Sequence, residues 1–372
     1  MKLTIERAAL LRSLSHVQSV VERRNTIPIL ANVLIDATNG TIYLTATDMD
    51  IAIVETAEST VLDPGTTTAP AHTLYDIVRK LPDGAQIALE TNNETNQLSL
   101  SAGRSRFTLA TLPTADFPSM SAGEMPHTFK IPAAELRSLV DRTRFAISTE
   151  ETRYYLNGIY LHTADVDGVQ LLRAAATDGH RLARVEMPLP EGASGMPGII
   201  IPRKTVAELR KLIDESDDVI DITLSDTKIK FAFDGAILTS KLIDGTFPDY
   251  EKVIPVGNDK FLEVDCHAFA EAVDRVATIS TERSRSIKLK VDANVLTLSA
   301  SSPDNGTAVE EIEVVYDKEA LEIGFNSRYL LDITQQVEGD TAQMAMADGA
   351  SPTIVRDSSD DSALYVLMPM RV

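Results

Sequence analysis

A threefold internal repeat constrains the fold of this chain more than any other feature of its sequence. Three stretches, beginning at Leu3, Phe129 and Phe261, each open with a short apolar alternation that leads into a helical pattern. In the second stretch the pattern comprises Leu136, Leu139, Val140, Thr143 and Ile147. Because this spacing places the side chains on one face, it predicts an amphipathic helix at the start of every copy.

The remainder of each copy recurs as well. An extended run enters a second helical pattern at residues 66–82, 198–214 and 321–337. Strand-like runs with polar turns lie between the two helices, and Thr47-Asp48 of the first copy returns as Thr177-Asp178 in the second. A further hairpin pattern closes each copy. We therefore predict an α+β fold of three repeated domains, each with two helices and antiparallel sheets.

The expected domain boundaries follow from the repeat. We place the domains at residues 1–127, 128–257 and 258–372, with linkers near 121–127 and 255–260, where Gly, Pro and polar residues gather. Strands that end in hairpins leave open edges, and repeated units commonly pair such edges into continuous sheets. The repeat thus predicts an organisation, but by itself it says nothing about function.

The bulk composition restricts the class of protein. No segment approaches the run of about 20 apolar residues that a membrane span requires, and the N-terminal residues lack the apolar core of a signal peptide. The single cysteine, Cys266, excludes an intrachain disulfide framework and a multi-cysteine metal site. Trp is absent and aromatic residues make up only 5%, which argues against a carbohydrate platform or a base-stacking surface. We expect a cytoplasmic protein with no membrane partner and no cofactor.

The net charge of −20 argues against a protein that holds nucleic acid by electrostatic attraction alone. Its distribution matters more than its sum, because basic groups recur on the predicted helices of the first two copies. These polar positions are Arg12, His16, Ser19, Arg23, His72, Arg79, Lys80, Arg137, Arg144, Arg203, Lys204, Arg210 and Lys211. The third copy mixes basic with acidic groups. A solvated face explains any single helix, whereas the recurrence indicates a shared surface with a more positive field.

The segment that most resembles an enzyme motif is residues 177–181. Asp178 and His180 are close enough in sequence to suggest a general base and its orienting acid, so a hydrolase or transferase is an alternative function. Gly179, however, is typical of a hairpin turn, and no nucleophile motif accompanies the pair. Residues 165–168 begin like a calcium loop without its closing glutamate, and residues 225–228 match only a loose serine–lysine pattern. Both are more typical of turns.

The C-terminal end is apolar and rich in methionine. Chain ends are usually disordered, so an apolar pattern over residues 367–372 is unusual, and methionine side chains adapt to varied apolar partners. A second cluster, residues 153–158, follows the first helix of the second copy. A buried core strand is the ordinary explanation for such residues, and a partner-binding surface is the alternative.

Several short motifs occur along the chain in a family-specific order. They occupy residues 28–30, 103–107, 115–118, 153–158, 176–182, 201–204, 247–250 and 368–371. With them the chain resembles, along its whole length, the beta subunits of bacterial DNA polymerase III, which are sliding clamps. The resemblance implies that two three-domain chains close head to tail into a six-domain ring, with the helices lining the hole.

The resemblance also implies two sets of site residues. A peptide-binding cleft between the second and third domains would use Tyr155, Leu156, Thr177, Gly179, His180, Arg181, Leu182, Pro248, Val253, Asn326, Tyr329, Val366, Met368, Pro369, Met370 and Arg371. The DNA-facing positions would be Arg24, Tyr154 and Tyr155, together with the helix cations Arg79, Lys80, Arg137, Arg203, Lys204 and Arg210. Glu150 and Glu151 depart from the family pattern, since some relatives carry an amide there.

The implied function is that of a non-catalytic processivity factor. A closed ring would hold double-stranded DNA topologically and without sequence preference, and would tether the DNA polymerase III catalytic subunit. The clamp loader, other polymerases and repair proteins would dock through a short peptide motif. A scaffold that acts without DNA is a further alternative.

Ring closure requires a homodimer, because an open array of repeats would leave exposed edges at both ends. We expect the first domain of one chain to meet the third domain of the other. Phe107 and Leu109 would face Ile279, and basic groups would lie near acidic ones. The residues expected at this interface are Arg104, Arg106, Phe107, Leu109, Ile279, Glu310, Glu311 and Glu313.

Overall fold

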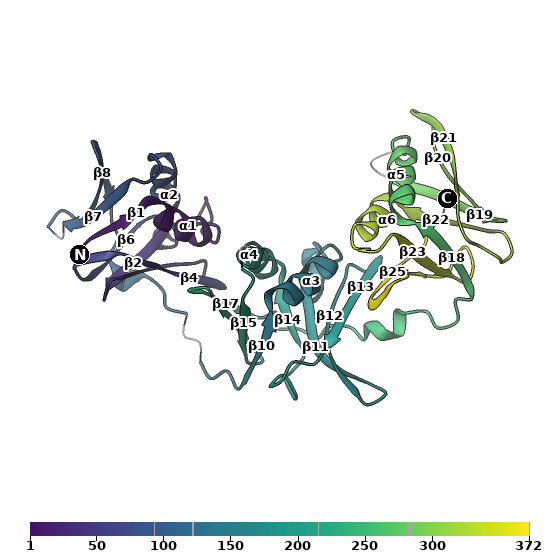
Figure 1. Cartoon of the computed structure of the whole chain (residues 1–372), viewed down its shortest axis with the longest axis horizontal. Helices are drawn as coiled ribbons and strands as arrows, with labels where there is room; N and C mark the ends of the chain where they lie inside the picture. The colour runs from purple at the N-terminus through teal and green to yellow at the C-terminus, as the bar shows by residue number, and fades with distance from the viewer. Residues whose placement is uncertain (93, 121–122, 215, 281–284, 372) are drawn as a thin grey trace. The chain divides into compact units, whose positions relative to one another are not determined.

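The computed structural model describes residues 1–92, 94–120, 123–214, 216–280 and 285–371 (Figure 1). Ser121 and Ala122 of the first expected linker and the terminal Val372 lie outside the described residues. The chain forms two compact units, one of residues 1–137, 190–197 and 204–242 and the other of residues 138–189, 198–203 and 243–372. The central repeat therefore contributes to both units. Within the described part of the chain, no helix is long and apolar enough to cross a membrane.

The first repeat lies wholly in the first unit. Its elements are β1 (Lys2–Glu6), α1 (Arg7–Val17), η1 (Pro28–Ala31), β2 (Asn32–Thr38), β3 (Thr41–Thr47), β4 (Ile51–Glu58), β5 (Thr60–Asp63), β6 (Gly65–Pro70), α2 (Ala71–Lys80), β7 (Gln86–Asn92), β8 (Gln97–Ala102), β9 (Ser105–Ala110) and η2 (Thr114–Asp116). Helix α1 begins after Glu6, whose carboxylate accepts from the backbone amides of Ala8 (2.9 Å) and Ala9 (3.2 Å). This cap satisfies donors that a helix start leaves open.

The central repeat has the same order of elements. They are β10 (His127–Pro132), α3 (Ala133–Arg144), η3 (Glu151–Leu156), β11 (Gly158–Val166), β12 (Val169–Thr177), β13 (Arg181–Pro188), β14 (Ile199–Pro202), α4 (Arg203–Asp214), β15 (Val219–Leu224), β16 (Lys228–Phe233) and β17 (Ala236–Lys241). The calcium-like segment is the β11–β12 turn, where Gly168 has a φ of 84° and its amide donates to Asp165 at 3.0 Å. The Ser225 hydroxyl likewise accepts from the Lys228 amide in the β15–β16 turn, at 3.2 Å.

The third repeat lies in the second unit. Its elements, with the segment leading into it, are η4 (Tyr250–Val253), β18 (Lys260–Asp265), α5 (Cys266–Ala277), β19 (Ser286–Asp292), β20 (Val295–Ser302), β21 (Gly306–Glu313), β22 (Leu321–Asn326), α6 (Ser327–Thr334), β23 (Thr341–Met346), β24 (Thr353–Asp357) and β25 (Asp360–Leu367). Asp265 caps α5 by accepting from Ala268 N at 2.8 Å, and Asn326 caps α6 by accepting from Arg328 N at 3.0 Å. Helices α5 and α6 pack together (Figure 1).

One pairing rule builds all three repeats. The strand before the first helix pairs with the closing hairpin strands, giving β1-β7-β8-β9, β10-β15-β16-β17 and β18-β23-β24-β25. The three middle strands pair with the strand before the second helix, giving β4-β3-β2-β6, β13-β12-β11-β14 and β21-β20-β19-β22. The predicted α+β fold with two helices and antiparallel sheets in each repeat is therefore confirmed.

The expected continuous sheets are also present. In the first unit β17 pairs with β4, with Leu238 opposite Ile53; we call this the first joint. In the second unit β25 pairs with β13, with Val366 opposite Leu182; we call this the second joint. At each joint the last closing strand of one repeat meets the last middle strand of another.

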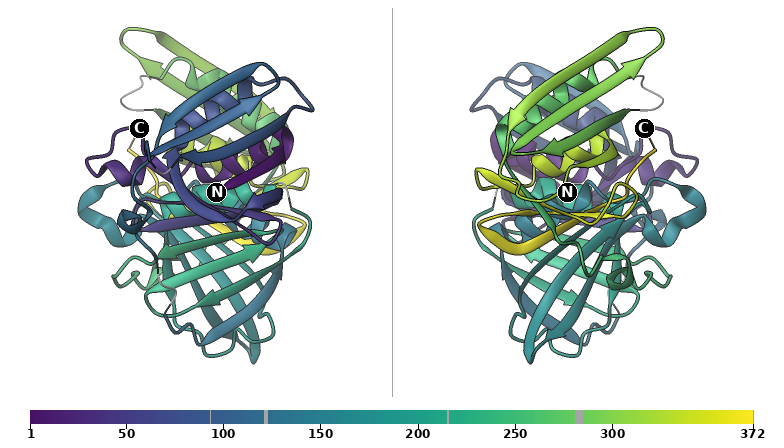
Figure 2. Two further views of the ribbon diagram at one scale, coloured as in Figure 1. Left: turned by 90° about the vertical axis from the view of Figure 1, so that its left-hand side faces the viewer. Right: turned by 90° about the vertical axis from the view of Figure 1, so that its right-hand side faces the viewer.

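Among the described strands, one last closing strand and one last middle strand are not part of a joint. Strand β9 is an edge of closing type, and β21, which runs as a long antiparallel ladder along β20, is an edge of middle type (Figure 2). Among the described strands, each of these two pairs on one side only. A second chain that followed the rule would therefore join its β21 to the β9 of the first.

Candidate functional site

An apolar cavity of about 340 Å³ lies beside the second joint. Its walls come from η3, the β12–β13 turn, the residues around η4 and the end of β25. The lining residues are Arg153, Tyr155, Leu156, Thr177, Gly179, Arg181, Leu182, Pro248, Asp249, Tyr250, Val253, Val366 and Met368. Leu156, Leu182 and Val366 belong to the buried core, whereas Met368 is 41% exposed. The cavity therefore has a fixed apolar floor and an open rim, which suits apolar side chains of a partner.

The β12–β13 turn is fixed by its own side chains. The Asp178 carboxylate accepts from the amides of His180 (2.9 Å) and Arg181 (3.1 Å), and the Thr177 hydroxyl donates to Arg181 O at 2.7 Å. Gly179 has a φ of 88°, a left-handed conformation that favours glycine. A Cβ at this position would lie 2.6 Å from Arg153 Nη1, so glycine also allows that guanidinium to approach.

Arg181 connects the turn to the third repeat. Its guanidinium pairs with Asp178 (3.1 Å) and Asp332 (2.5 Å) and donates to Phe145 O at 2.6 Å. It also lies over the Tyr329 ring, 4.3 Å from the centroid. Because all of these contacts are largely shielded from solvent, Arg181 is a structural wall of the site more than a free cation.

Arg153 closes the opposite side of the apolar cavity. It forms two hydrogen bonds to Glu150, at 2.8 and 2.7 Å, and a third to Asp178 O at 2.9 Å. The hydrogen bond from Arg153 lowers the pKa of Glu150, which therefore stays ionised. Glu150, one of the two residues that depart from the family pattern, thus has a defined role here: it positions Arg153.

The terminal residues lie beyond β25 and are attached by the backbone. Met368 N donates to His180 O at 2.9 Å, and Met370 N donates to Gly324 O at 2.8 Å. The strand itself is core, since Leu367 is fully buried, whereas Met368 reaches the apolar cavity. The two interpretations of this segment, a buried core strand and a partner-binding surface, therefore apply to different residues. The chain is core up to Leu367 and surface from Met368 onward.

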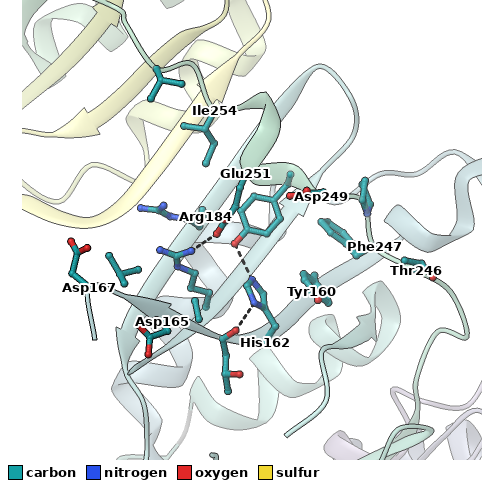
Figure 3. Close-up of a pocket in the computed structure, with 17 residues that line it drawn as sticks. Tyr160, His162, Asp165, Asp167, Arg184, Thr246, Phe247, Asp249, Glu251 and Ile254 are labelled. Carbon is teal, nitrogen blue, oxygen red and sulfur yellow. Dashed lines mark hydrogen bonds and ion pairs between the residues drawn. The ribbon is translucent and has the colours of Figure 1, made fainter. Parts of the chain in front are cut away.

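A second, larger cavity of about 1000 Å³ shares Pro248, Asp249 and Tyr250 with the apolar cavity (Figure 3). Here η4 is held against the sheet. His162 Nε2 lies 2.9 Å from the Tyr250 hydroxyl, and Arg173 forms an ion pair with Glu251. The Tyr160 ring stacks on His162 and on Phe247, with centroids 4.5 and 4.8 Å apart. These contacts fix the η4 wall of the apolar cavity.

The protonation state of this anchor follows from its partners. Since the Thr163 carbonyl, 2.9 Å from His162 Nδ1, can only accept, Nδ1 carries the proton and Nε2 accepts from Tyr250. Burial lowers the pKa of His162 and raises the pKa of Tyr250 to about 12. Both groups are therefore neutral at pH 7.

A basic pocket adjoins the apolar cavity and shares Arg181 with it. Its lining residues are Arg144, Phe145, Ile147, Ser148, Thr149, Glu150, Asp178, His180, Arg181, Arg203, Arg285, Asn326, Arg328 and Tyr329. Three residues that the family resemblance placed in the cleft, His180, Asn326 and Tyr329, lie here, outside the apolar cavity. Pro369, Met370 and Arg371 line a fourth pocket with Lys288 and Gly324.

The other ten expected cleft residues line the apolar cavity. They are Tyr155, Leu156, Thr177, Gly179, Arg181, Leu182, Pro248, Val253, Val366 and Met368. The sequence analysis did not assign Arg153, Asp249 or Tyr250, although each lies inside a motif that carried the resemblance. Their position in those motifs was the available signal.

The geometry gives no support to catalysis at Asp178 and His180. The Asp178 carboxylate is used by the turn and by Arg181, and the His180 side chain is exposed. Among the described residues, no three His, Cys, Asp or Glu side chains are placed to hold a metal ion. The hydrolase or transferase alternative is therefore not supported.

The expected DNA-facing cations differ in availability. Arg137 is half-buried and donates to Ile213 O and Ser216 O, at 2.9 and 3.0 Å, so it is occupied in the fold. Lys204 pairs with Asp48 (2.5 Å) and Glu22 (3.2 Å); burial alone would lower its pKa, but these partners raise it. Both residues were expected to face DNA, and both already have partners within the chain.

The remaining basic positions are mixed. Arg79 pairs with Asp76 at 3.2 Å and Arg210 with Asp214 at 2.8 Å. His16, expected on the polar face of α1, is instead half-buried, 2.6 Å from Glu55. Side chains that remain exposed are those of Arg24, Lys80, Tyr154 and Arg203, while Tyr155 turns into the apolar cavity. The accessible positive surface is thus smaller than the sequence pattern indicated.

The two open edges carry the residues expected at a dimer contact. On β9, Phe107 is 36% exposed with Arg106 beside it, and Arg104 is exposed in the preceding turn. Leu109, in contrast, is only 8% exposed.

The β21 edge is acidic around one apolar residue. Val309 is 68% exposed, Glu311 and Glu313 are exposed, and Glu310 already pairs with Arg275 of α5 at 2.7 Å. Ile279 is half-buried just beyond the end of α5. The two edges are therefore opposite in charge, and each has an exposed apolar residue.

Comparison with known proteins agrees with this architecture. Family profiles match the N-terminal, central and C-terminal domains of the DNA polymerase III beta subunit at residues 1–121, 130–249 and 251–371. The beta sliding clamp of Caulobacter vibrioides is 56% identical over 372 residues, with all of both chains covered, and that of Escherichia coli is 38% identical over 373 residues with the same coverage.

Solved structures give the same result. A crystal structure of the Caulobacter crescentus beta sliding clamp superimposes with a TM-score of 0.98 at 56% identity, covering 100% of this chain and 99% of that one. The sliding clamp of Bartonella birtlesii bound to griselimycin gives a TM-score of 0.97 at 50% identity, with both chains fully covered.

Proposed function

This chain belongs to the DNA polymerase III beta subunit family, the sliding clamps, which are processivity factors without catalytic activity of their own, and from that premise we propose how it works. Two copies close head to tail into a ring around double-stranded DNA. The ring tethers the DNA polymerase III catalytic subunit in the cytoplasm. The clamp loader, other polymerases and repair proteins dock on it through short peptides.

The observation that carries this proposal is the pairing rule of the sheets. The first and second joints both combine a closing edge with a middle edge, and one edge of each type is left, on β9 and β21. Arg104 and Arg106 near β9 complement the glutamates of β21, and Phe107 complements the exposed Val309. Uncovered edges with exposed apolar residues favour pairing with a second chain. We accordingly propose a β9–β21 interface between chains.

The repeat boundaries support the proposed domains at residues 1–127, 128–257 and 258–372. Strand β10 begins at His127 and β18 at Lys260, so each proposed boundary falls within a few residues of an opening strand. The central domain supplies strands to both joints, one sheet in each unit. It is therefore the domain that connects the other two.

Ring topology explains how a chain of net charge −20 can act on DNA. A closed ring retains DNA without tight binding, so weak phosphate contacts, with a dissociation constant of roughly 10⁻⁴ to 10⁻⁶ M, are compatible with sliding. The few exposed groups, such as Arg24, Lys80 and Arg203, fit that weak regime. Tethering through a short link raises the effective concentration of the polymerase at its template to about the millimolar range.

The apolar cavity is the proposed anchor site for partner peptides. It offers adaptable Met368 beside a fixed floor of Leu182 and Val366, with the η4 wall opposite. An extended peptide with two or three apolar anchors typically binds with about micromolar affinity, near −8 kcal/mol, which suits partners that exchange.

The test is to load the protein on nicked circular DNA and then linearise the DNA. We expect release on cutting, because retention is topological, and sedimentation should give a dimer at micromolar concentration. Protein that stays bound after cutting at moderate salt, or that sediments as a monomer, would contradict the ring. A DNA-independent scaffold would show no retention on the circle before cutting.

A further inference from the structure

The larger cavity beside η4 has buried arginines and an acidic mouth (Figure 3). Arg173 of β12 and Arg184 of β13 lie on its sheet side, where their side chains are only 7% and 15% exposed. Asp165 and Asp167 of the β11–β12 turn line the cavity with exposed side chains. All lining residues belong to the second unit, and a volume of about 1000 Å³ suits a small molecule. The proposed clamp function uses only the η4 wall of this cavity.

Most polar groups on the sheet side of the larger cavity already have partners. Arg173 donates to Glu186 at 2.7 Å and forms an ion pair with Glu251. The Tyr250 hydroxyl donates to His162 at 2.9 Å. These groups are therefore satisfied within the fold and do not require a ligand.

Arg184 is different, because its pairing is incomplete. Its nearest carboxylate is Glu186 at 3.7 Å, which is too far for a hydrogen bond and is already bound by Arg173. The Nε atom of Arg184 is buried and has no hydrogen-bond partner among the described residues. Burial lowers the pKa of Arg184, and the positive charges of Arg173 and Arg356 lower it further, while Glu186 opposes them. Since a guanidinium stays charged at neutral pH, Arg184 is a desolvated cation with too few partners.

The sheet register explains why no neighbouring side chain completes this pairing. Residues opposite one another on adjacent strands share a face, and Arg184 lies opposite Ala175 on β12 and Leu364 on β25. Both neighbours are apolar and buried, so neither side chain can accept a hydrogen bond. Along β13 the next residue on this face is Glu186, the carboxylate that Arg173 binds. Further acceptors for Arg184 must therefore come from molecules in the cavity.

From this arrangement we infer that the larger cavity binds a compact oxyanion, the phosphate or carboxylate group of a small molecule, on the guanidinium of Arg184. The planar guanidinium matches either group with two parallel hydrogen bonds, and the ligand would supply the negative charge that Glu186 shares with Arg173. This inference goes beyond the proposed clamp function and does not depend on it.

The cavity fits one charged group better than a polyanion. Asp165, Asp167 and Asp249 line it, and their carboxylates would repel a chain of phosphates. Nucleic-acid backbones are bound by several cations along a groove, whereas Arg173 is already committed to two carboxylates. A small molecule with one oxyanion can reach Arg184 and leave its uncharged part at the mouth.

The experiment measures binding of small anions to the full-length protein by isothermal titration calorimetry. Inorganic phosphate and acetate are the probes, and whichever binds more tightly identifies the source of the oxyanion. We expect a dissociation constant on the order of 1 mM for the tighter probe, as for one charge-assisted contact. Tripolyphosphate should bind no more tightly than phosphate, because the acidic mouth disfavours additional charge.

Variants assign the binding to Arg184. Arg184→Met should weaken binding of the tighter probe at least tenfold. In buffer without either probe its melting temperature should equal or exceed that of the wild type, because replacing an incompletely paired buried charge by an apolar side chain is often neutral or stabilising. Lys290→Gln, which removes an exposed cation of β19 outside the cavity, is the control and should bind like the wild type.

Asp167→Asn tests the mouth of the cavity without touching its buried side. Asp167 is exposed and has a φ of 52°, a conformation that asparagine also adopts. Removing its charge should tighten binding of the tighter probe about twofold at low salt, with the difference shrinking as salt rises. This variant keeps the inference testable if Arg184→Met fails to fold, since unchanged affinity at low salt would count against it.

Three results would overturn the inference. They are undiminished anion binding by Arg184→Met, a lower melting temperature of Arg184→Met in buffer without the probes, which would make the arginine purely structural, and tighter binding of tripolyphosphate than of phosphate. Fluorescence anisotropy of a labelled peptide with two apolar anchors separates this site from the proposed function. We expect wild type and Arg184→Met to bind that peptide equally, and failure of the wild type to bind it would contradict the proposed function alone.

Discussion

The first and second joints have the same backbone and different side chains. At the first joint Lys241 N donates to Asp50 O at 2.8 Å, and at the second Met368 N donates to His180 O at 2.9 Å. Lys241 and Met368 each stand at the end of a closing strand, and Asp50 and His180 each lie in the turn before a middle strand. Equivalent positions of two repeats therefore meet in an equivalent way.

The two turns have equivalent hydrogen bonds. Asp48 accepts from the amides of Asp50 and Ile51 at 2.9 and 2.8 Å, as Asp178 does from His180 and Arg181. Met49 has a φ of 80°, close to the 88° of Gly179. The Thr-Asp pair fixes this turn in both repeats because its side chains satisfy the backbone donors that the turn leaves open.

The two joints differ in the side chains that surround these turns. The first joint is polar, with Lys241 paired to Asp50 at 3.0 Å and Lys204 paired to Asp48. The second has Met368 where the first has Lys241, and Gly179 where the first has Met49. The comparison teaches that a shared joint becomes a candidate binding site through a few substitutions that leave its backbone unchanged.

The largest expected effect on peptide binding comes from replacing Met368 of the second joint by lysine, the residue at the equivalent position 241 of the first joint. Met368→Lys places a charge at the rim of the apolar cavity, and loss of a central anchor typically costs about 2 kcal/mol or more, or about 30-fold in peptide affinity. The melting temperature should change little, because Met368 is partly exposed. Anisotropy and a thermal melt measure both quantities. Met368→Leu is the control, and an unchanged affinity in Met368→Lys would remove the cavity from the binding site.

A smaller effect is expected from Gly179→Ala. The new Cβ would lie 2.6 Å from Arg153 Nη1, so Arg153 must move away from Glu150, and we expect peptide binding to weaken about tenfold. Gly195→Ala is the matched control, since its φ of 74° imposes a similar backbone strain of about 1 kcal/mol while no atom lies within 4 Å of the new Cβ. Both variants should lose stability in denaturant, and only Gly179→Ala should lose binding. Equal binding by the two would show that Arg153 has no role at the rim.

The η4 wall, anchored by His162, also distinguishes the second joint. We expect it to make the stability of the fold depend on pH. Because the folded-state pKa of His162 is lowered, the unfolded chain binds its proton first, and stability is lost as pH falls from about 6.5 through the lowered pKa. His162→Gln keeps a neutral side chain that cannot be protonated in this range, so this loss of stability should disappear. We expect the melting temperature of the wild type to fall more steeply than that of His162→Gln between pH 7 and pH 5. Parallel curves would mean that protonation of His162 is not linked to folding.

The smallest effect is expected at the first joint. Lys241→Met copies the second joint but removes only an exposed ion pair with Asp50, so stability should change by less than about 1 kcal/mol. No peptide binding should appear there, because the η4 wall, Leu182 and Arg153 have not been copied. Chemical denaturation would measure the stability. Anisotropy would measure peptide binding at the first joint, in a variant that also carries Met368→Lys to weaken binding at the second. Peptide binding restored by Lys241→Met would indicate that one side chain suffices.

Much of the fold could be predicted from the sequence because local patterns recur three times. The apolar spacing predicted a helix with Leu136, Leu139 and Val140 on one face, and these residues are buried. Gly168 and Gly179 predicted turns at which both adopt positive φ. Such features depend on residues within a few positions of one another, and the chain encodes them directly.

What the sequence could not indicate involves partners distant in sequence. His16 was expected on the polar face of its helix and is half-buried against Glu55. Arg137 was expected to face DNA, and its side chain donates to the carbonyls of Ile213 and Ser216. Leu109 was expected at a chain contact, and within the single chain it is only 8% exposed. Helical or strand spacing states which face a residue occupies, but not what covers that face.

The sequence by itself therefore determined the three repeats, their helices and turns, and the resemblance that identifies the family. Only the tertiary structure decided which cations stay available, and it separated the expected cleft residues between an apolar cavity and a basic pocket. The physical reason is that local hydrogen bonding and periodicity are properties of short segments. The availability of a charge, in contrast, depends on carboxylates and carbonyls that folding brings from far along the chain, as Asp332 is brought to Arg181.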